Sequence, residues 1–302
     1  MLIPLIFVCL PYLTTVECRF KGKIHVKHTP NMWLTNIPDS RKLNTLAFVG
    51  TRDPPTFETT FKRLPKLLPL SDKLTVGIRV FDMGVRRINN DFAMYNGSFS
   101  MRAKFVDLVQ TIKKFLKDNP KEFVIMIMHA ESTASKSTLS ECEILRKKYV
   151  EKYPNLFVEN WSLDDTVGQH RGKILLLEKS PEFNGCSTSL SCVVHDQQNE
   201  NLKNDLGEYY EYVRELQAEV NKQNSKCYLF YMTTNREFYF KDEKISADAK
   251  LTKMIQYNDQ DIPETFGSLI DTFNNTKNSF YTIVADLPTL DVLNLIISSN
   301  TK

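Results

Sequence analysis

Glycine and proline are scarce in this chain, with 10 and 13 residues among 302, and they are scattered rather than clustered. That scatter excludes a low-complexity or collagen-like chain. The chain also lacks a strong excess of either charge. It has 39 lysines and arginines and 36 aspartates and glutamates, which gives a formal net charge of +3. Nucleic-acid-binding domains usually carry a strong basic excess, so we expect no nucleic-acid partner.

Metal-binding and repeat signatures are absent as well. The sequence holds no Cys-x-x-Cys pair and no cysteine–histidine spacing typical of a metal site, so we expect neither a metal nor a cofactor. No internal repeat and no long linker divides the chain. The hydrophobic and charged fractions, 42% and 25%, are those of a globular protein. A chain of this length buries enough surface to fold as one large domain.

The first apolar run, residues 1–18, is too short and too interrupted by Pro4 and Pro11 to span a bilayer. The residues near its end are small and polar, as in a secretory signal peptide, although no lysine or arginine precedes the run. A buried element at the start of the fold is the alternative. We favour a signal peptide over 1–18, which predicts a secreted, extracellular protein with one domain over 19–302.

Four cysteines follow residue 18, namely Cys142, Cys186, Cys192 and Cys227. An even number in a secreted chain favours two disulfides, for which three pairings exist. Cys186 and Cys192 flank a short loop rich in serine and threonine, so we expect them to pair and to leave Cys142 with Cys227.

Three glycosylation sequons also fit a secreted glycoprotein, and they begin at Asn96, Asn160 and Asn274.

Apolar runs alternate with amphipathic stretches along the chain. We expect buried strands at residues 46–49, 74–81, 92–95, 123–128, 173–177, 228–232 and 281–285. We expect helices at residues 101–117, 139–153, 206–221 and 288–298. Continuous apolar strands are buried on both faces, and their alternation with helices is typical of a parallel α/β barrel. In such barrels the chemistry lies at the carboxyl ends of the strands.

Four segments near those strand ends occur in a recognisable order. Residues 43–53 end in Gly-Thr-Arg-Asp, residues 77–82 read Gly-Ile-Arg-Val-Phe-Asp, and residues 115–126 and 171–177 each lead into a strand. Together they resemble the X domain of phosphatidylinositol-specific phospholipases C in its compact single-domain form. The resemblance covers most of the chain after residue 18. It implies a distorted TIM barrel and a phosphoric diester hydrolase of lipid metabolism.

The resemblance also shows where this chain departs from the family. In the family, one histidine takes a proton from the inositol 2-hydroxyl, and a second protonates the leaving oxygen. An arginine or a bound Ca²⁺ steadies the phosphate. This chain has Arg52 and Asn96 at the two histidine positions and Gly84 at the phosphate-steadying position. Arginine keeps its proton at neutral pH and an asparagine amide has none to give. Each lost step is typically worth about 10²–10⁴ in rate, so we expect a catalytically impaired pseudoenzyme.

Several carboxylates survive around the expected site. In the family, the equivalents of Asp53 and Asp286 orient the catalytic histidines; here we expect both to pair with Arg52, with Asp82 nearby. One interpretation is a buried ion-pair network kept for packing. The other is that Arg52 anchors a phosphoinositide or an inositol-phosphate-like anion, with peripheral membrane contact, because guanidinium matches such groups. We favour the first.

His129, with Glu131 two residues later, is the one histidine at an expected strand end. It is either an inner-wall residue with satisfied hydrogen bonds or a substrate-binding group, base or metal ligand; we favour the first. An active phosphodiesterase remodelled around His129 and Asp82 is the alternative to a pseudoenzyme. Asn96 also has two interpretations, because a glycan there would cover the pocket, whereas a strand-end turn residue would be unmodified. We favour the unmodified residue.

Overall fold

The structure is a computed structural model. It describes residues 32–52, 69–97, 99–131, 137–196, 206–222, 226–232, 239–240, 243–244, 279–285 and 290–301. The signal peptide predicted at 1–18, and also Asp53, Asn274 and Asp286, lie outside the described residues.

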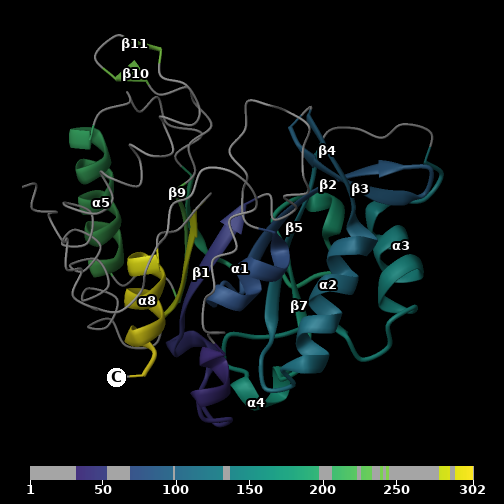
Figure 1. The fold of residues 1–302 in the computed structure, drawn as a ribbon, viewed down its shortest axis with the longest axis horizontal. Helices are drawn as coiled ribbons and strands as arrows, with labels where there is room; N and C mark the ends of the chain where they lie inside the picture. Colours follow the sequence, from purple (N-terminus) through teal and green to yellow (C-terminus); the bar gives the residue numbers. More distant parts are fainter. Residues whose placement is uncertain are drawn as a thin grey trace, which may run out of the picture.

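Parallel strands form the centre of the molecule (Figure 1). They are β1 (Ala47–Arg52), β2 (Val80–Ile88), β5 (Val124–Ala130), β6 (Phe157–Val158), β7 (Ile174–Glu178), β8 (Val193–Asp196), β9 (Cys227–Met232) and β12 (Phe280–Ala285). Their order is β6-β7-β5-β2-β1-β12-β9-β8, and every neighbouring pair is parallel. In the part of the chain that the structure describes, β6 and β8 do not pair, so the curled sheet is an incomplete barrel. The predicted distorted barrel is confirmed.

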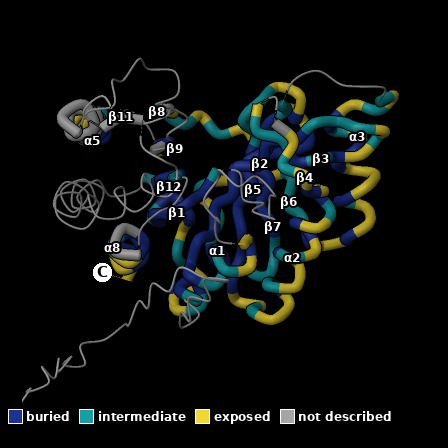
Figure 2. Tube along the Cα trace, turned by 45° about the horizontal axis from the view of Figure 1, so that its top comes forward, coloured by how far each residue is buried: buried dark blue, intermediate teal, exposed yellow. Residues whose placement is uncertain are grey.

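Helices cover the outside of this sheet. They are α1 (Leu70–Val76), α2 (Phe105–Asp118), α3 (Glu141–Leu145), α4 (Val167–His170), α5 (Leu206–Asn221) and α8 (Leu290–Ser299). Short turns are η1 (Trp33–Asn36), η2 (Leu43–Thr45), η4 (Pro181–Phe183) and the π-helical turn η3 (Arg146–Val150). An antiparallel hairpin, β3 (Asp91–Asn96) and β4 (Phe99–Lys104), extends β2, and β10 (Tyr239–Phe240) pairs with β11 (Glu243–Lys244). Figure 2 shows the central strands buried and the exposed residues on the outer faces of the helices. Among the described residues, no helix is long and apolar enough to cross a bilayer.

Two predicted elements differ from the structure. Residues 74–81 were expected to be one strand, but α1 continues to Val76 and β2 begins only at Val80. Gly77 separates them, because its φ of 110° ends the helix in a conformation that glycine adopts without strain. The helix expected from residue 101 begins at Phe105, since the preceding residues form β4. The other predicted helices and strands overlap the observed ones.

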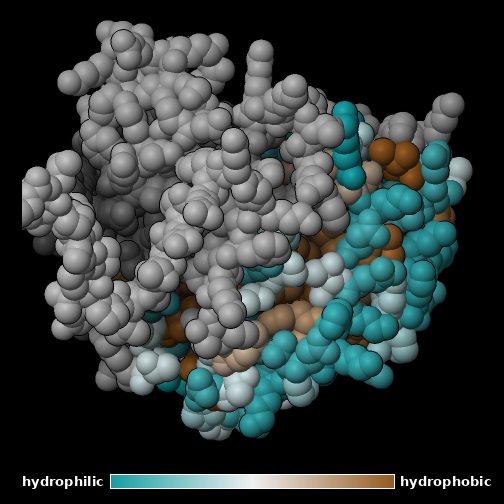
Figure 3. Space-filling view, in the orientation of Figure 1, coloured by the Kyte–Doolittle hydropathy of each residue, from teal (hydrophilic) through white to brown (hydrophobic). Residues whose placement is uncertain are grey.

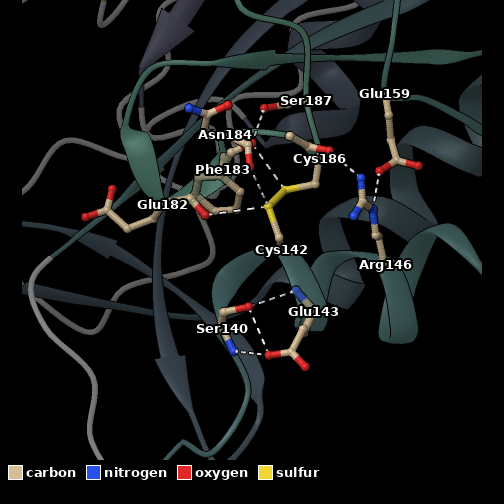
Figure 4. The surroundings of a disulfide bond; sticks show 11 residues. Ser140, Cys142, Glu143, Arg146, Glu159, Glu182, Phe183, Asn184, Cys186 and Ser187 are labelled. Carbon is tan, nitrogen blue, oxygen red and sulfur yellow. Dashed lines mark hydrogen bonds and ion pairs between the residues drawn. A yellow bond between two sulfur atoms is a disulfide. The ribbon is translucent and has the colours of Figure 1, made fainter.

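The predicted disulfide pairing is wrong. Cys142 on α3 pairs with Cys186 in the loop after η4, as Figure 4 shows, and Cys192 pairs with Cys227. Cys192 and Cys227 stand at the starts of β8 and β9, which are adjacent parallel strands. The pairing therefore follows neighbours in space, which the spacing of cysteines along the chain does not show. Both bonds join elements that are 35 or more residues apart.

A buried ion pair ties together the amino ends of β2 and β5. Arg79 Nε lies 2.8 Å from Glu122 Oε2, and both side chains are fully buried. Arg79 also donates to the carbonyls of Leu74 and Ile78, while Glu122 accepts from the backbone N–H and the hydroxyl of Thr35. Because the Arg79 and Glu122 side chains are both fully buried, loss of one partner leaves an uncompensated charge in the interior.

We expect Glu122→Gln to lower the free energy of unfolding by about 3–5 kcal/mol, because it strands the Arg79 guanidinium in the core. Urea unfolding followed by circular dichroism measures this. Lys114→Gln, which removes an exposed ion pair with Asp118, is the matched control and should cost under about 1 kcal/mol. Equal effects of the two substitutions would contradict a role for the buried pair.

Candidate active site

The carboxyl ends of four neighbouring strands bring five charged side chains together. Arg52 ends β1 and is paired in register with Asp82 on β2, while His129 lies on β5 opposite Gly84 of β2. Glu131 follows β5 directly, and Lys179 follows β7. Arg52, Asp82, His129 and Glu131 were predicted to lie near this edge, and the structure places them there.

Asp82 is the centre of this cluster and is fully buried. Its Oδ1 lies 2.7 Å from His129 Nδ1 and its Oδ2 lies 3.0 Å from Lys179 Nζ. The contact with His129 is an ion pair. Burial alone would raise the pKa of Asp82, but the charges of His129, Lys179 and Arg52 outweigh it and lower the pKa well below its ordinary value. Asp82 is therefore ionised at neutral pH.

His129 lies between two carboxylates. Its Nε2 is 2.8 Å from Glu131 Oε1, opposite the contact of Nδ1 with Asp82. Burial would lower the pKa of His129, but the charge of Asp82 and the bonds to Asp82 and Glu131 raise it to about 9. At neutral pH the ring is consequently an imidazolium, and both of its N–H groups point to carboxylates. A ring in this state has no lone pair with which to accept a proton.

Glu131 fills the space next to Gly84. A Cβ at position 84 would lie 2.3 Å from the Tyr95 carbonyl oxygen and 2.9 Å from Glu131 Oε1, so the backbone and Glu131 leave no room for a side chain. The Glu131 carboxylate accepts a hydrogen bond from the Gly97 N–H. Burial would raise the pKa of Glu131, but the contact with His129 and the bond from Gly97 lower it. Arg86 fixes the same region, because it donates to the carbonyls of Glu131 and Gly97 and lies 3.9 Å from the centre of the Tyr95 ring.

Arg52 differs from the other charged residues of the cluster. Its Nε and Nη1 are buried, and neither has a hydrogen-bond acceptor in the described part of the chain. Asp82 and Glu131 feel its charge, but neither forms an ion pair with it. Buried N–H groups without an acceptor are costly, so an acceptor is expected at this place. The carboxylates predicted for that role, Asp53 and Asp286, lie outside the described residues.

Lys179 is a site residue that the sequence analysis missed. Besides its bond to Asp82, its ammonium lies 3.7 Å from the centre of the Tyr231 ring. A signal was present, because strand residues alternate between faces. Leu177 pairs in register with Ile127, and Lys179 follows two residues later on the same face as His129.

Asn96 ends β3 and is half-buried beside Gly97, whereas Asn160 is exposed. The side chain of Asn96 has no proton to transfer, whatever bonds it makes. Among the described residues, no three histidine, cysteine, aspartate or glutamate side chains are grouped so that they could hold a metal ion.

Comparison with known proteins identifies relatives of this chain. Residues 58–180 match the family model of the phosphatidylinositol-specific phospholipase C X domain. A 1-phosphatidylinositol phosphodiesterase of Listeria monocytogenes is 29% identical over 160 residues, which is half of this chain and half of the Listeria protein.

Solved structures share the fold. The F249X mutant of phosphatidylinositol-specific phospholipase C from Staphylococcus aureus has a TM-score of 0.69 at 18% identity, over 90% of this chain and 98% of that one. The phosphatidylinositol-specific phospholipase C from Listeria monocytogenes has a TM-score of 0.66 at 18% identity, over 89% and 98% of the two chains. At such identity the structures establish the barrel alone.

The raised pKa of His129 predicts how stability depends on pH. Below the unfolded pKa of about 6.5 the ring is charged in both states and its ion pairs contribute fully; this contribution is lost as the pH rises through about 9. The free energy of unfolding should therefore fall by about 2–3 kcal/mol between pH 6 and pH 9.5. Urea unfolding at the two pH values measures this fall.

His129→Gln should abolish that fall. His170→Gln is the matched control, because burial lowers the pKa of His170 and the fall should persist in that variant. A fall of the same size in His129→Gln would show that another group causes it.

Proposed function

Because the chain belongs to the phosphatidylinositol-specific phospholipase C X-domain family, we propose that it is a catalytically impaired member that binds a phosphate-bearing anion of the phosphoinositide type. One observation supports this most strongly. In the described part of the cluster, the only histidine is an ion-paired imidazolium and Arg52 presents buried N–H groups without an acceptor.

The loss of catalysis follows from proton chemistry. Cleavage of a phosphodiester by an internal hydroxyl needs a base to remove a proton and an acid to protonate the leaving oxygen. Arg52 and Asn96 supply neither. His129 is protonated and engaged on both nitrogens, and Asp82 is bound to His129 and Lys179. No described side chain of the cluster is therefore both free and basic enough to serve.

Anion binding follows from the balance of charge. Arg52, Lys179 and the His129 imidazolium are three cations, against the two carboxylates of Asp82 and Glu131. Among the described side chains the cluster is thus one positive charge in excess, and Arg52 Nε and Nη1 are buried donors without an acceptor there. A phosphate offers the oxygens that a guanidinium fork matches. An anion there would satisfy donors that are otherwise buried without acceptors.

The setting of the protein is part of the same proposal. Residues 1–18 serve as a signal peptide, and 19–302 form one secreted barrel domain that contacts lipid surfaces peripherally. Two disulfides support this, because such bonds persist in oxidising compartments. The sequon at exposed Asn160 suits a glycan, whereas half-buried Asn96 suits it less.

The test combines binding with activity. Inositol 1-phosphate at a hundred times its dissociation constant should raise the free energy of unfolding by about 2.7 kcal/mol. Arg52→Met should abolish the effect, and Arg214→Met, a substitution of an exposed arginine on α5, should leave it unchanged. Thermal unfolding with and without the ligand measures both.

Phosphatidylinositol vesicles form the activity arm, in which we expect no release of inositol phosphate or its cyclic form. Release that His129→Ala abolishes would establish the alternative, an active phosphodiesterase remodelled around His129 and Asp82. Absence of both release and stabilisation would contradict the binding function while leaving the impaired site in place.

A further inference from the structure

A second charged surface lies on the outside of the barrel, where α2 and η3 pack side by side. The Tyr149 ring of η3 packs on Phe105 of α2, with ring centroids 4.8 Å apart. One turn further along, the Tyr153 ring lies 4.9 Å from the ammonium of Lys113 on α2. Hydrophilic side chains dominate the lower right face of Figure 3, where Figure 1 places α2 and α3.

Four exposed lysines form what we term the α2–η3 basic surface, namely Lys113, Lys117, Lys148 and Lys152. The ammonium groups of Lys113 and Lys152 come from the two different segments and lie 4.9 and 5.7 Å from the centre of the same Tyr153 ring. That ring is itself buried, with 8% of its surface exposed. The buried Tyr153 ring thus contacts a lysine of α2 and a lysine of the segment after η3, and it keeps the two pairs of lysines next to each other.

The spacing of these lysines does not favour helix stability. Lys113 and Lys117 are four residues apart on α2, and like charges at this spacing repel each other on a helix. Lys148 and Lys152 are also four residues apart, with Lys152 in the turn after η3. In the described part of the chain none of the four forms an ion pair. Their neighbours do, because Lys114 binds Asp118 and Lys147 binds Glu143.

Of the described acidic side chains near this surface, all but one are bound to other groups. Asp118 and Glu143 are bound to lysines outside the surface, and Glu143 also closes the amino end of α3 through Ser140. Exposed Glu151 remains, against four lysines. A surface with four lysines against one glutamate attracts an anion that carries several charges.

We propose that the α2–η3 basic surface binds a linear sulfated polysaccharide. Lysine ammonium groups make point-charge contacts that suit sulfate and need no planar acceptor. Lys113 and Lys117 lie about 6 Å apart along the axis of α2, so successive charges of an extended chain meet successive lysines.

The same surface fits other polyanions less well. Among the described residues the only large hydrophobic side chain that is well exposed is Val194 on β8, so the basic surface has nothing to insert into a bilayer. Tyr153 is buried and presents no face on which a nucleic-acid base could stack. The surface is also separate from the barrel site, because Lys113 and Lys117 lie in the second half of α2, which leads to Glu122 at the amino ends of the strands.

Immobilised heparin, a sulfated polysaccharide, tests the proposal with the full secreted chain. The triple variant Lys113→Gln, Lys117→Gln and Lys152→Gln should bind heparin on the order of tenfold more weakly at 0.15 M salt. The matched control replaces Lys42, Lys222 and Lys226, three exposed lysines elsewhere, by glutamine and changes the net charge equally. It should stay within about twofold of the unsubstituted protein.

Equal weakening in both triple variants would show attraction by net charge alone and would overturn the proposal. Unchanged binding in the first triple variant would also overturn it, as would binding to phosphatidylserine vesicles that depends on the same lysines when heparin does not bind. Circular dichroism melting of both variants checks that each is folded. Stabilisation by inositol 1-phosphate should be unchanged in both, which separates this surface from the function proposed for the barrel.

Discussion

His129 shares its two ring nitrogens between Asp82 on β2 and Glu131 at the end of β5, and the carboxyl end of the barrel is organised around that contact. The two carboxylates keep the ring charged. The charged ring and Lys179 in turn keep Asp82 ionised in full burial. Glu131 contacts the ring and accepts a hydrogen bond from the Gly97 N–H, and it occupies the space beside Gly84. In the described part of the cluster, these charged groups are thus paired with one another, whereas Arg52 Nε and Nη1 have no acceptor.

These mutual ion pairs stabilise the carboxyl end of the barrel with charged side chains in its interior. In an active site, buried titratable groups are held near the pH at which they work. Here the pKa values of the histidine and the carboxylates are moved apart, so that all three groups are charged and paired at neutral pH. Such a cluster stabilises the strand ends that it joins. Among the described donors of the cluster, Arg52 Nε and Nη1 are buried without an acceptor.

Much of the fold could be predicted because it depends on local pattern. Continuous apolar strands alternating with amphipathic helices indicated a parallel barrel, and the order of four segments indicated the family. The strand predicted at 74–81 failed because apolar and β-branched residues stand on both sides of Gly77, and only the backbone at Gly77 shows that a helix ends there. The disulfide pairing failed for a different reason. Cys192 and Cys227 are neighbours through the pairing of β8 with β9, which the spacing of cysteines does not encode.

The site was predictable to the extent that strand ends identify residues that meet. Arg52, Asp82, His129 and Glu131 were found in this way. The residues that contact them were not predicted, because contacts between strands depend on the register in which the strands pair. Lys179 reaches Asp82 from β7, and Glu131 takes the space beside Gly84. The sequence also left open whether His129 is an inner-wall residue with satisfied hydrogen bonds or a substrate-binding group, base or metal ligand. The two carboxylate distances favour the inner-wall residue, with a ring that is charged at neutral pH.

The protonation state of His129 tests the central claim most directly. Nuclear magnetic resonance of protein labelled with ¹⁵N-histidine reports the two ring nitrogens between pH 5 and pH 10, and the spectrum of His129→Gln identifies the signals. We predict that both nitrogens remain protonated at pH 7.5 and titrate near pH 9. A ring that is neutral at pH 7.5, with one unprotonated nitrogen and a transition near 6.5, would contradict the account.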